Sequence, residues 1–445
     1  MFLFVNYCTP NWYFNLLKAQ NLNCYLVNYD NLDQFEKSLI DYDENYSSKE
    51  VSLLDASYQA LKKGINLKVK SNFLSNSICE PSIADNYRFI TKYYGFPWVI
   101  FVFFIRMLSL KKPVNEILGF LKCLNVKRVD LYKSVNPISL LEFNSGLLKA
   151  APFVSVIIPT LNRYEYLERC ITDLEKQKYK YFELIVVDQS EPYQPSFYEN
   201  RNIEINLIRQ ETKGLWMGRN NAIRKAKGEY ILLYDDDSII EPNWIEMHLK
   251  CIDFFNVNIS SGVSLAAVGS KIPKSYSFYR WADQIDTGNV LIKKDIFRKI
   301  GLFDEQFEGM RLGDGEFGFR SFLNSIAMIS NPEACRIHLK VETGGLRQMG
   351  SWDAFRPIRF FAPKPIPSVI YFYKRYLNPF NYRTTIFIGL LLSNIKYENK
   401  KHNIFLITSM IKSIFLFPLV LFQYKKSKKI ATKMILEGPK IYFDI

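Results

Sequence analysis

The feature that most restricts the fold of this sequence is a regular alternation of apolar runs and helix-like segments between residues 152 and about 345. Short apolar runs rich in Val, Ile, Leu and Tyr are typical of buried strands. They are FVSVII at 153–158, ELIVV at 183–187, IEINLI at 203–208 and EYILLY at 229–234.

The segments between these runs have helical patterns. In 164–177 the apolar residues Leu167, Cys170, Ile171 and Leu174 recur at helical spacing, and we expect the helix in 216–228 to end at Gly228. Strands that alternate with helices indicate an α/β fold with a mostly parallel sheet flanked by helices. Ligands of such sheets bind beyond the carboxyl ends of the strands.

Polar residues follow three of the predicted strands. They are Pro159, Thr160, Asn162 and Arg163 after the first, Asp188, Gln189 and Ser190 after the second, and Asp235, Asp236 and Asp237 after the fourth. We expect all three groups to lie at one edge of the sheet. One aspartate there could cap the next helix. Three adjacent carboxylates are better explained by a hard divalent cation, which prefers oxygen ligands.

The D-x-D spacing divides the three aspartates by direction. On an extended segment Asp235 and Asp237 point to the same side and can meet one Mn²⁺ or Mg²⁺, or a diphosphate bound to it. Asp236 points elsewhere, to a ribose or to Arg219. We expect the repulsion to be offset when cation and diphosphate bind, and the loop to be strained or mobile without them.

Several motifs together resemble the family 2 glycosyltransferases, which have the GT-A fold. These motifs are VSVIIPTLNR, ELIVVDQS, GRNNAIRKAKGEYILLYDDD, GLFDEQF and GDGEFGFR, in that order, over about residues 152–345. The resemblance implies an inverting, metal-dependent transfer of a sugar from a nucleotide-diphosphate sugar (UDP-, GDP- or dTDP-linked) to an acceptor hydroxyl.

The resemblance also assigns residues to roles. Donor nucleotide contacts are implied for Pro159, Thr160, Asn162, Arg163, Asp188, Ser190, Arg219, Asp235 and Asp236. Ligands of Mn²⁺ or Mg²⁺ are implied for Asp235, Asp237 and His338. His338 could instead be an ordinary hydrogen-bonded histidine at the end of a strand.

The catalytic base of that family lies in an acidic motif further along the chain. Counted back from Arg320, Asp314 matches the base aspartate, and Gly313 stands where the family has glutamate. This departure leaves Glu316 as a second candidate, and we favour Asp314.

Other functions fit the sequence less well. Residues 313–318 satisfy G-x-G-x-x-G, but no strand precedes them, so they do not predict a dinucleotide site. A nucleotidyltransferase would also use paired aspartates with Mg²⁺. It is the alternative, although the first strand end has no phosphate-binding Gly-rich loop or lysine. The basic tail also permits a non-catalytic membrane or nucleic-acid binder, but without a metal the D-x-D edge would repel phosphate.

Several further residues have two readings. Gly344, Gly345 and Arg347 could form a lid over the diphosphate or a plain connector. Trp281 and Trp352 could stack on a sugar or lie in the core. We expect His248 on a helix surface and His402 in solvent.

The charge is concentrated near the C-terminus. The formal net charge is +14, and residues 396–445 contain ten lysines, no arginine and three acidic residues, which is half of that excess. The seven cysteines are widely spaced without C-x-x-C, which favours reduced thiols in a cytosol-like compartment. The first residues do not have the pattern of a signal peptide.

The sequence therefore divides into three predicted regions. Residues 1–150 form an α/β or helical unit of unknown role, with a first strand in 2–6 and a buried or interfacial helix in 97–108. Residues 151–350 form the GT-A domain. Residues 351–445 form a helical basic region whose segment 404–422 lies on an anionic membrane or in a core. We expect a glycan or lipid-linked acceptor, a role in bacterial surface polysaccharide synthesis of the O-antigen type, and a place at the cytoplasmic face of the plasma membrane.

Overall fold

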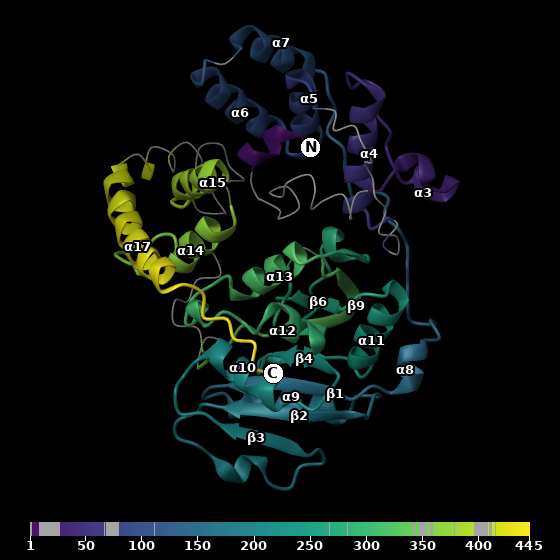
Figure 1. Ribbon diagram of the computed structural model, residues 1–445, viewed down its shortest axis with the longest axis vertical. Coiled ribbons are helices and arrows are strands. Elements are labelled where there is room, and N and C mark those ends of the chain that lie inside the picture. Colours follow the sequence, from purple (N-terminus) through teal and green to yellow (C-terminus); the bar gives the residue numbers. More distant parts are fainter. Residues whose placement is uncertain are drawn as a thin grey trace.

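A computed structural model gives the architecture of the chain (Figure 1). It describes residues 2–8, 27–65, 67, 80–110, 112–266, 268–282, 284–341, 344–346, 354–356, 359–377, 379–395, 408, 412–413 and 415–445. In Figure 1 helices α3 to α7 of the N-terminal region lie above the sheet, and the C-terminal helices α14, α15 and α17 lie to one side.

The centre of the molecule is a nine-stranded sheet with the order β3-β2-β1-β4-β8-β6-β9-β5, and β7 pairs with β9. The strands are β1 Val154–Thr160, β2 Phe182–Asp188, β3 Ile205–Arg209, β4 Tyr230–Tyr234, β5 Ser238–Ile240, β6 Ile259–Leu265, β7 Arg280–Trp281, β8 Asn289–Lys293 and β9 Met328–His338. The four strands predicted from the sequence are β1 to β4, so the predicted α/β class is confirmed.

The predicted parallel order holds in the half of the sheet that contains β3, β2, β1 and β4. In the other half β8 runs antiparallel to β4 and β6, while β6 and β9 are parallel. The register pairs Thr160 with Asp188 across β1 and β2, and Ser238 with His338 across β5 and β9. These pairings bring the polar strand ends to one edge.

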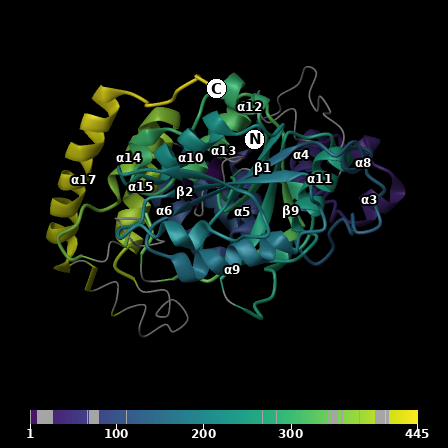
Figure 2. The same cartoon turned by 90° about the horizontal axis from the view of Figure 1, so that it is seen from below.

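Helices cover both faces of this sheet, with α9 on one side and α10, α12 and α13 on the other (Figure 2). They are α9 Tyr164–Glu175, α10 Leu215–Lys225, α11 Trp244–Phe255, α12 Asp295–Ile300 and α13 Gly313–Leu323, with the short 3-10 turns η3 Pro195–Tyr198, η4 Lys274–Tyr276 and η5 Glu305–Phe307. Helix α9 buries Leu167, Cys170, Ile171 and Leu174, as its periodicity predicts.

The prediction that Gly228 ends helix α10 is wrong, because the helix stops at Lys225. Gly228 instead donates its N–H to the Ser155 hydroxyl at 2.8 Å. A Cβ at this position would lie 2.5 Å from the Ser155 nitrogen, so the glycine permits the chain to pass close to β1 as it enters β4.

The described part of the N-terminal region is helical. Its elements are η1 Leu3–Tyr7, η2 Tyr29–Asn31, α3 Gln34–Ser38, α4 Lys49–Lys62, α5 Ile83–Tyr93, α6 Phe96–Leu108, α7 Pro113–Cys123 and α8 Gly146–Ala150. The strand predicted for residues 2–6 is wrong: this stretch forms the 3-10 helix η1, whose Phe4 N–H is bound by the Asn86 side chain at 3.1 Å. Phe2 stacks on Phe89 with ring centroids 4.0 Å apart, so the apolar run packs on α5 rather than on a sheet.

The described part of the C-terminal region contains α14 Pro367–Tyr376, α15 Pro379–Leu392 and α17 Phe417–Glu437. After α17 the chain returns to the sheet domain, where the Tyr442 carbonyl accepts from the Leu302 N–H at 2.8 Å and Asp444 pairs with Arg224 at 3.0 Å. Among the described residues, no helix is long and apolar enough to cross a membrane. Residues 404–407, 409–411 and 414 of the predicted segment 404–422 lie outside the described residues, and its last part begins α17.

Candidate functional site

The acidic motif lies where β4 ends and the short strand β5 begins. Asp235, Asp237 and His338 each offer one ligand atom, and these atoms lie within 4.8 Å of one another. His338 comes from the end of β9, and its Nε2 lies 3.2 Å from Asp237 Oδ1. The antiparallel pairing of β5 with β9 produces this convergence, since it sets His338 opposite Ser238. The three residues that the sequence suggested as metal ligands therefore meet in space.

Arginines surround the three carboxylates. Arg219 Nη2 lies 2.7 Å from one oxygen of Asp235, and Arg336 Nη1 lies 3.0 Å from the other. Arg163 Nη1 lies 3.0 Å from Asp236 and 3.2 Å from Asp237. The chain therefore supplies guanidinium groups that offset part of the repulsion among the carboxylates, in addition to the cation and diphosphate expected from the sequence.

Asp236 connects two strand ends. It is buried, accepts from the Thr160 hydroxyl at 2.8 Å, and accepts from Arg163 on its other oxygen. Burial raises the pKa of Asp236 to about 6, although the Arg163 charge opposes that rise. The sequence suggested a ribose or Arg219 as its partner. Arg219 in fact binds Asp235 and Thr287, while Asp236 fixes the end of β1 against the end of β4.

Arg336 and Asp286 belong to this site, and the sequence reasoning missed both. Arg336 is 2% exposed and donates to both oxygens of Asp286, at 3.0 and 3.1 Å. Burial acts to raise the pKa of Asp286, but the Arg336 charge outweighs it, and the pKa lies below its ordinary value. Arg336 stands two residues before His338 in CRIHLK, so alternation along β9 was the available signal.

Gly288 permits the close approach of these groups. A Cβ at this position would lie 2.2 Å from Asp235 Oδ2 and 2.3 Å from Arg336 Nη1. Real Cβ atoms do not come so near, so any larger residue would displace the ion pair that holds Asp235.

The second strand end forms a separate polar cluster around Asp188. Asp188 is fully buried and accepts from the hydroxyls of Tyr164 at 2.7 Å and Tyr198 at 2.9 Å. Its other oxygen accepts from the Ser190 N–H at 2.8 Å. The two tyrosines were missed, since nothing in their spacing links them to Asp188.

Two hydrogen bonds join the segments that follow β1 and β2. Ser190 Oγ accepts from the Asn162 N–H at 2.8 Å, and Asn162 Oδ1 accepts from the Glu191 N–H at 2.7 Å. Asn162 has φ +55°, a left-handed conformation that asparagine tolerates. Pro159 and Thr160, the remaining predicted donor contacts, are the last two residues of β1.

The segment predicted as a lid or connector packs on this edge. The Gly345 N–H donates to the Leu161 carbonyl at 3.0 Å, and a Cβ on Gly345 would lie 2.7 Å from Arg163 Nη2. With φ of +68° and +85°, Gly344 and Gly345 adopt conformations that favour glycine. Arg347 lies outside the described residues.

The two candidate bases differ in their surroundings. Asp314 is half-buried in the first turn of α13. Glu316 is fully buried and accepts from Arg320 Nε at 3.0 Å and from the Tyr376 hydroxyl. The glycines of the G-x-G-x-x-G stretch lie inside helix α13, with no strand before them, which agrees with the sequence-based exclusion of a dinucleotide loop.

The departure at Gly313 has a steric cause. A Cβ there would lie 2.3 Å from Cζ2 of Trp216. Trp216 is buried, and its Nε1 donates to the Phe307 carbonyl at 3.1 Å. The indole thus occupies the space that a glutamate side chain at position 313 would need.

Two other sequence readings are resolved by burial. His248 is not on a helix surface, because it is fully buried with ring nitrogens 2.9 Å from Ser260 Oγ and 3.0 Å from Asn289 Oδ1. Burial lowers its pKa to about 4. Trp281 is 3% exposed and lies in the core. Trp352 and His402 lie outside the described residues.

Part of the chain is similar in sequence to known proteins. Residues 155–309 match the family described as Glycosyl transferase family 2. A chondroitin synthase of Escherichia coli is 29% identical over 124 residues, 27% of this chain and 18% of that protein. The glycosyltransferase GlyG of Streptococcus pneumoniae is 35% identical over 99 residues, 21% of this chain and 33% of that protein. The chain thus matches less than two thirds of the length of these curated relatives.

Among solved structures, a mannosyltransferase of Pyrobaculum calidifontis in complex with GDP-Man and Mn²⁺ superposes with a TM-score of 0.41. The two chains are 16% identical, and the superposition covers 63% of this chain and 83% of that one.

Proposed function

We propose that the chain, whose residues 155–309 match the family 2 glycosyltransferases, transfers a sugar from a nucleotide-diphosphate sugar to an acceptor hydroxyl. The observation that carries the proposal is the convergence of Asp235, Asp237 and His338 at the carboxyl edge of the sheet. Ligands of α/β sheets bind at that edge. We propose a UDP-, GDP- or dTDP-linked sugar as the donor.

The residues present fit a divalent cation. Two carboxylates and one imidazole within 4.8 Å are a donor set suited to Mn²⁺ or Mg²⁺, with remaining positions for donor phosphates. When bound, the cation would neutralise the negative charge that develops on the leaving diphosphate. Arg219 and Arg336 hold Asp235 from two sides, and Arg163 holds Asp237, so the ligand carboxylates are oriented before anything binds.

The base we propose is Asp314. Asp314 is half-buried at the start of α13 and accepts from the Gly315 N–H at 2.8 Å, whereas Glu316 is fully buried and is bound by Arg320 and Tyr376. Asp314 would take the proton of the acceptor hydroxyl as that oxygen attacks the anomeric carbon. A single displacement with one base leads to inversion. Glu316 joins α13 to α14 through Tyr376 and is a positioning residue.

We place the transfer at a membrane surface. Helix α6 exposes Phe96, Ile100, Phe104 and Leu108, each four residues after the last, by 44%, 46%, 65% and 71%. Helix α7 exposes Val114 by 65%, Leu118 by 53% and Leu121 by 53%. Helix α17 adds exposed Leu421 and Phe422 next to Lys425 and Lys426.

Two neighbouring apolar stripes with lysines nearby suit an anionic bilayer surface. The acceptor we propose is a glycan or lipid-linked glycan of bacterial surface polysaccharide synthesis of the O-antigen type, at the cytoplasmic face of the plasma membrane.

The released product tests the reaction class. The purified chain is incubated with a panel of UDP-, GDP- and dTDP-sugars, with and without Mn²⁺, and nucleoside diphosphate is measured. Parallel reactions with nucleoside triphosphates and sugar 1-phosphates are assayed for pyrophosphate. We expect metal-dependent release of nucleoside diphosphate, reduced about hundredfold or more in Asp237→Asn. Formation of pyrophosphate instead would make the alternative, a nucleotidyltransferase, the correct class.

A further inference from the structure

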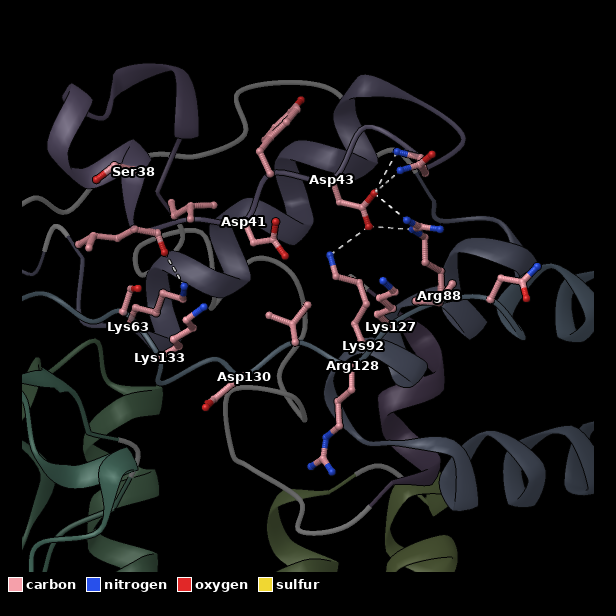
Figure 3. A pocket seen from close by; sticks show the side chains of 18 of the residues that line it. Ser38, Asp41, Asp43, Lys63, Arg88, Lys92, Lys127, Arg128, Asp130 and Lys133 are labelled. Atoms are coloured by element: carbon pink, nitrogen blue, oxygen red, sulfur yellow. Dashed lines mark hydrogen bonds and ion pairs between the residues drawn. The ribbon is translucent and has the colours of Figure 1, made fainter.

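A basic cavity lies in the N-terminal region, in a part of the chain that the family match does not cover (Figure 3). Its volume is about 880 Å³, within the range of small-molecule sites. The walls come from residues 38–45, from α5 and from the segment that follows α7. Seven lysine or arginine and three aspartate side chains line it.

Three of the seven cations have partners within the protein. Arg88 lies 2.8 Å from Asp43, and Lys92 lies 3.1 Å from Asp43 and 2.6 Å from Asp55. Lys63 donates to the Leu39 carbonyl. Asp43 therefore already forms ion pairs with two cations, and these pairs hold Arg88 and Lys92 in place.

The other four cations are different. Lys122, Lys127, Arg128 and Lys133 are exposed, and none has an ion-pair or side-chain hydrogen-bond partner within the part of the chain that the structure describes. Asp130, the third lining aspartate, faces Lys274 at 3.8 Å. Seven cations against three aspartates leave a formal excess of four positive charges around the cavity, so a bound anion would stabilise this arrangement.

The positions of these side chains suit a phosphate. Figure 3 shows Lys63 and Lys133 on one side of the cavity, and Lys92 and Lys127 on the opposite side near Asp43. Asp41 and Asp130 are labelled between the two sides, and an anion next to them could be contacted by cations from both sides. The lining also contains Ser134 and Asn125, which can donate hydrogen bonds to phosphate oxygens.

The cavity also adjoins the exposed apolar stripe. Lys122 lies in α7 between Leu121 and Leu124, which are 53% and 47% exposed. Arg128 lines a second cavity of about 480 Å³ together with Phe96 and Trp98, at the start of α6. The cationic side chains therefore lie next to the exposed apolar surface. In this arrangement the apolar side chains can enter a bilayer while the cations contact the lipid phosphates.

From these contacts we propose that the cavity binds a phosphate or diphosphate group, presented by an anionic lipid or by a soluble phosphate ester. The site is separate from the D-x-D edge, and the inference does not depend on the glycosyltransferase proposal. The ligand phosphate would form ion pairs with Lys122, Lys127, Arg128 and Lys133, which have no such partner among the described residues.

The test uses the full chain and two matched double variants. Lys127→Ala with Lys133→Ala removes two cavity cations, and Lys149→Ala with Lys299→Ala removes two exposed lysines elsewhere, so the net charge is the same. One arm titrates pyrophosphate by calorimetry in EDTA, which denies the D-x-D edge any metal. The other measures flotation with vesicles of phosphatidylglycerol and phosphatidylcholine, against phosphatidylcholine alone.

We expect the cavity variant to bind at least about tenfold more weakly than wild type, and the control variant to bind like wild type. An effect in the pyrophosphate arm alone identifies a soluble phosphate ester. An effect in the vesicle arm, with or without the other, identifies an anionic lipid. Absence of binding in both arms, or equal weakening by both variants, would overturn the proposal.

Discussion

The arginine that holds the acidic edge together can be removed in a single step. Arg336→Met keeps most of the side-chain length but deletes the guanidinium, which donates to Asp235 at 3.0 Å, Ser238 at 2.7 Å, Ser264 at 2.6 Å and Asp286 at 3.0 Å. Because Arg336 is 2% exposed, the variant leaves carboxylates without their buried counterion. Breaking a buried pair in this way costs about 3–5 kcal/mol.

The matched control is Arg298→Met. Arg298 forms an ion pair with Asp295 at 2.5 Å, but both side chains are more than half exposed. Such a surface pair contributes about 0.5 kcal/mol or less. In thermal unfolding followed by calorimetry we expect Arg336→Met to lower the Tm by about 3–5 °C and Arg298→Met by about 0.5 °C or less, because the entropy of unfolding of 445 residues is about 0.9 kcal/mol/K.

The pH dependence of the Tm tests whether the ion pair between Arg336 and Asp286 causes this loss of stability. Arg336 holds the pKa of Asp286 below its ordinary value, so this pair stabilises wild type above the unfolded-state pKa of aspartate and loses that effect as the pH falls through the folded-state value. The Tm difference between wild type and Arg336→Met should therefore shrink as the pH is lowered from 7 towards 3. The reasoning would be refuted if Arg336→Met and Arg298→Met lowered the free energy of unfolding by amounts that differ by less than about 1 kcal/mol. A Tm difference between wild type and Arg336→Met that stays constant with pH would refute it as well.

Three further predictions concern the base, a buried histidine and the apolar stripe. Asp314→Asn should abolish sugar transfer while donor binding persists; transfer at a rate near that of wild type would mean that another residue is the base. His248 has a folded-state pKa of about 4, below the value of about 6.5 in the unfolded chain. Its contribution to the free energy of unfolding should therefore be fully present above pH 6.5 and fall by about 3 kcal/mol as the pH drops to 4, because His248 takes up a proton in the unfolded chain over this interval. Denaturation of His248→Gln should show a weaker dependence over that interval, and an unchanged slope would contradict the assignment. Phe104→Ser with Leu108→Ser should reduce flotation with anionic vesicles by about tenfold or more, since each apolar side chain contributes about 1.5–3 kcal/mol on burial. Leu141→Ser with Val268→Ser, at positions 55% and 71% exposed, is the control, and an equal loss in both variants would argue against a specific stripe.

The sequence predicted the elements whose pattern is local. The continuous apolar runs of β1 to β4 identify a sheet buried on both faces, and the polar residues that follow them identify its functional edge. The D-x-D spacing correctly placed Asp235 and Asp237 near one another, because alternation along an extended chain is a short-range property.

The contacts that the sequence did not predict depend on tertiary structure. Arg336 lies 101 residues after Asp235, and only the position of β9 in the sheet brings them together. The steric reason for Gly313 lies in Trp216, on another helix. His248 looks like a surface residue from its helix alone, but β6 and β8 bury it beside Ser260 and Asn289.

The N-terminal error has a related cause. Residues 2–6 are apolar enough for a strand, but an apolar run specifies only burial, and the surface available to it is the helical face that contains Phe89 and Asn86. A short apolar run does not by itself distinguish a buried strand from a buried helical turn.

The central claim is that Asp235, Asp237 and His338 hold a divalent cation to which the donor diphosphate binds. Calorimetric titration of the donor identified in the product assay, with and without Mn²⁺, tests it most directly. Wild type should bind the donor at least about tenfold more tightly with Mn²⁺, and Asp237→Asn should lose that difference, while Asp295→Asn at an exposed position keeps it. Equal affinity with and without Mn²⁺ in wild type, or a metal effect preserved in Asp237→Asn, would contradict the account.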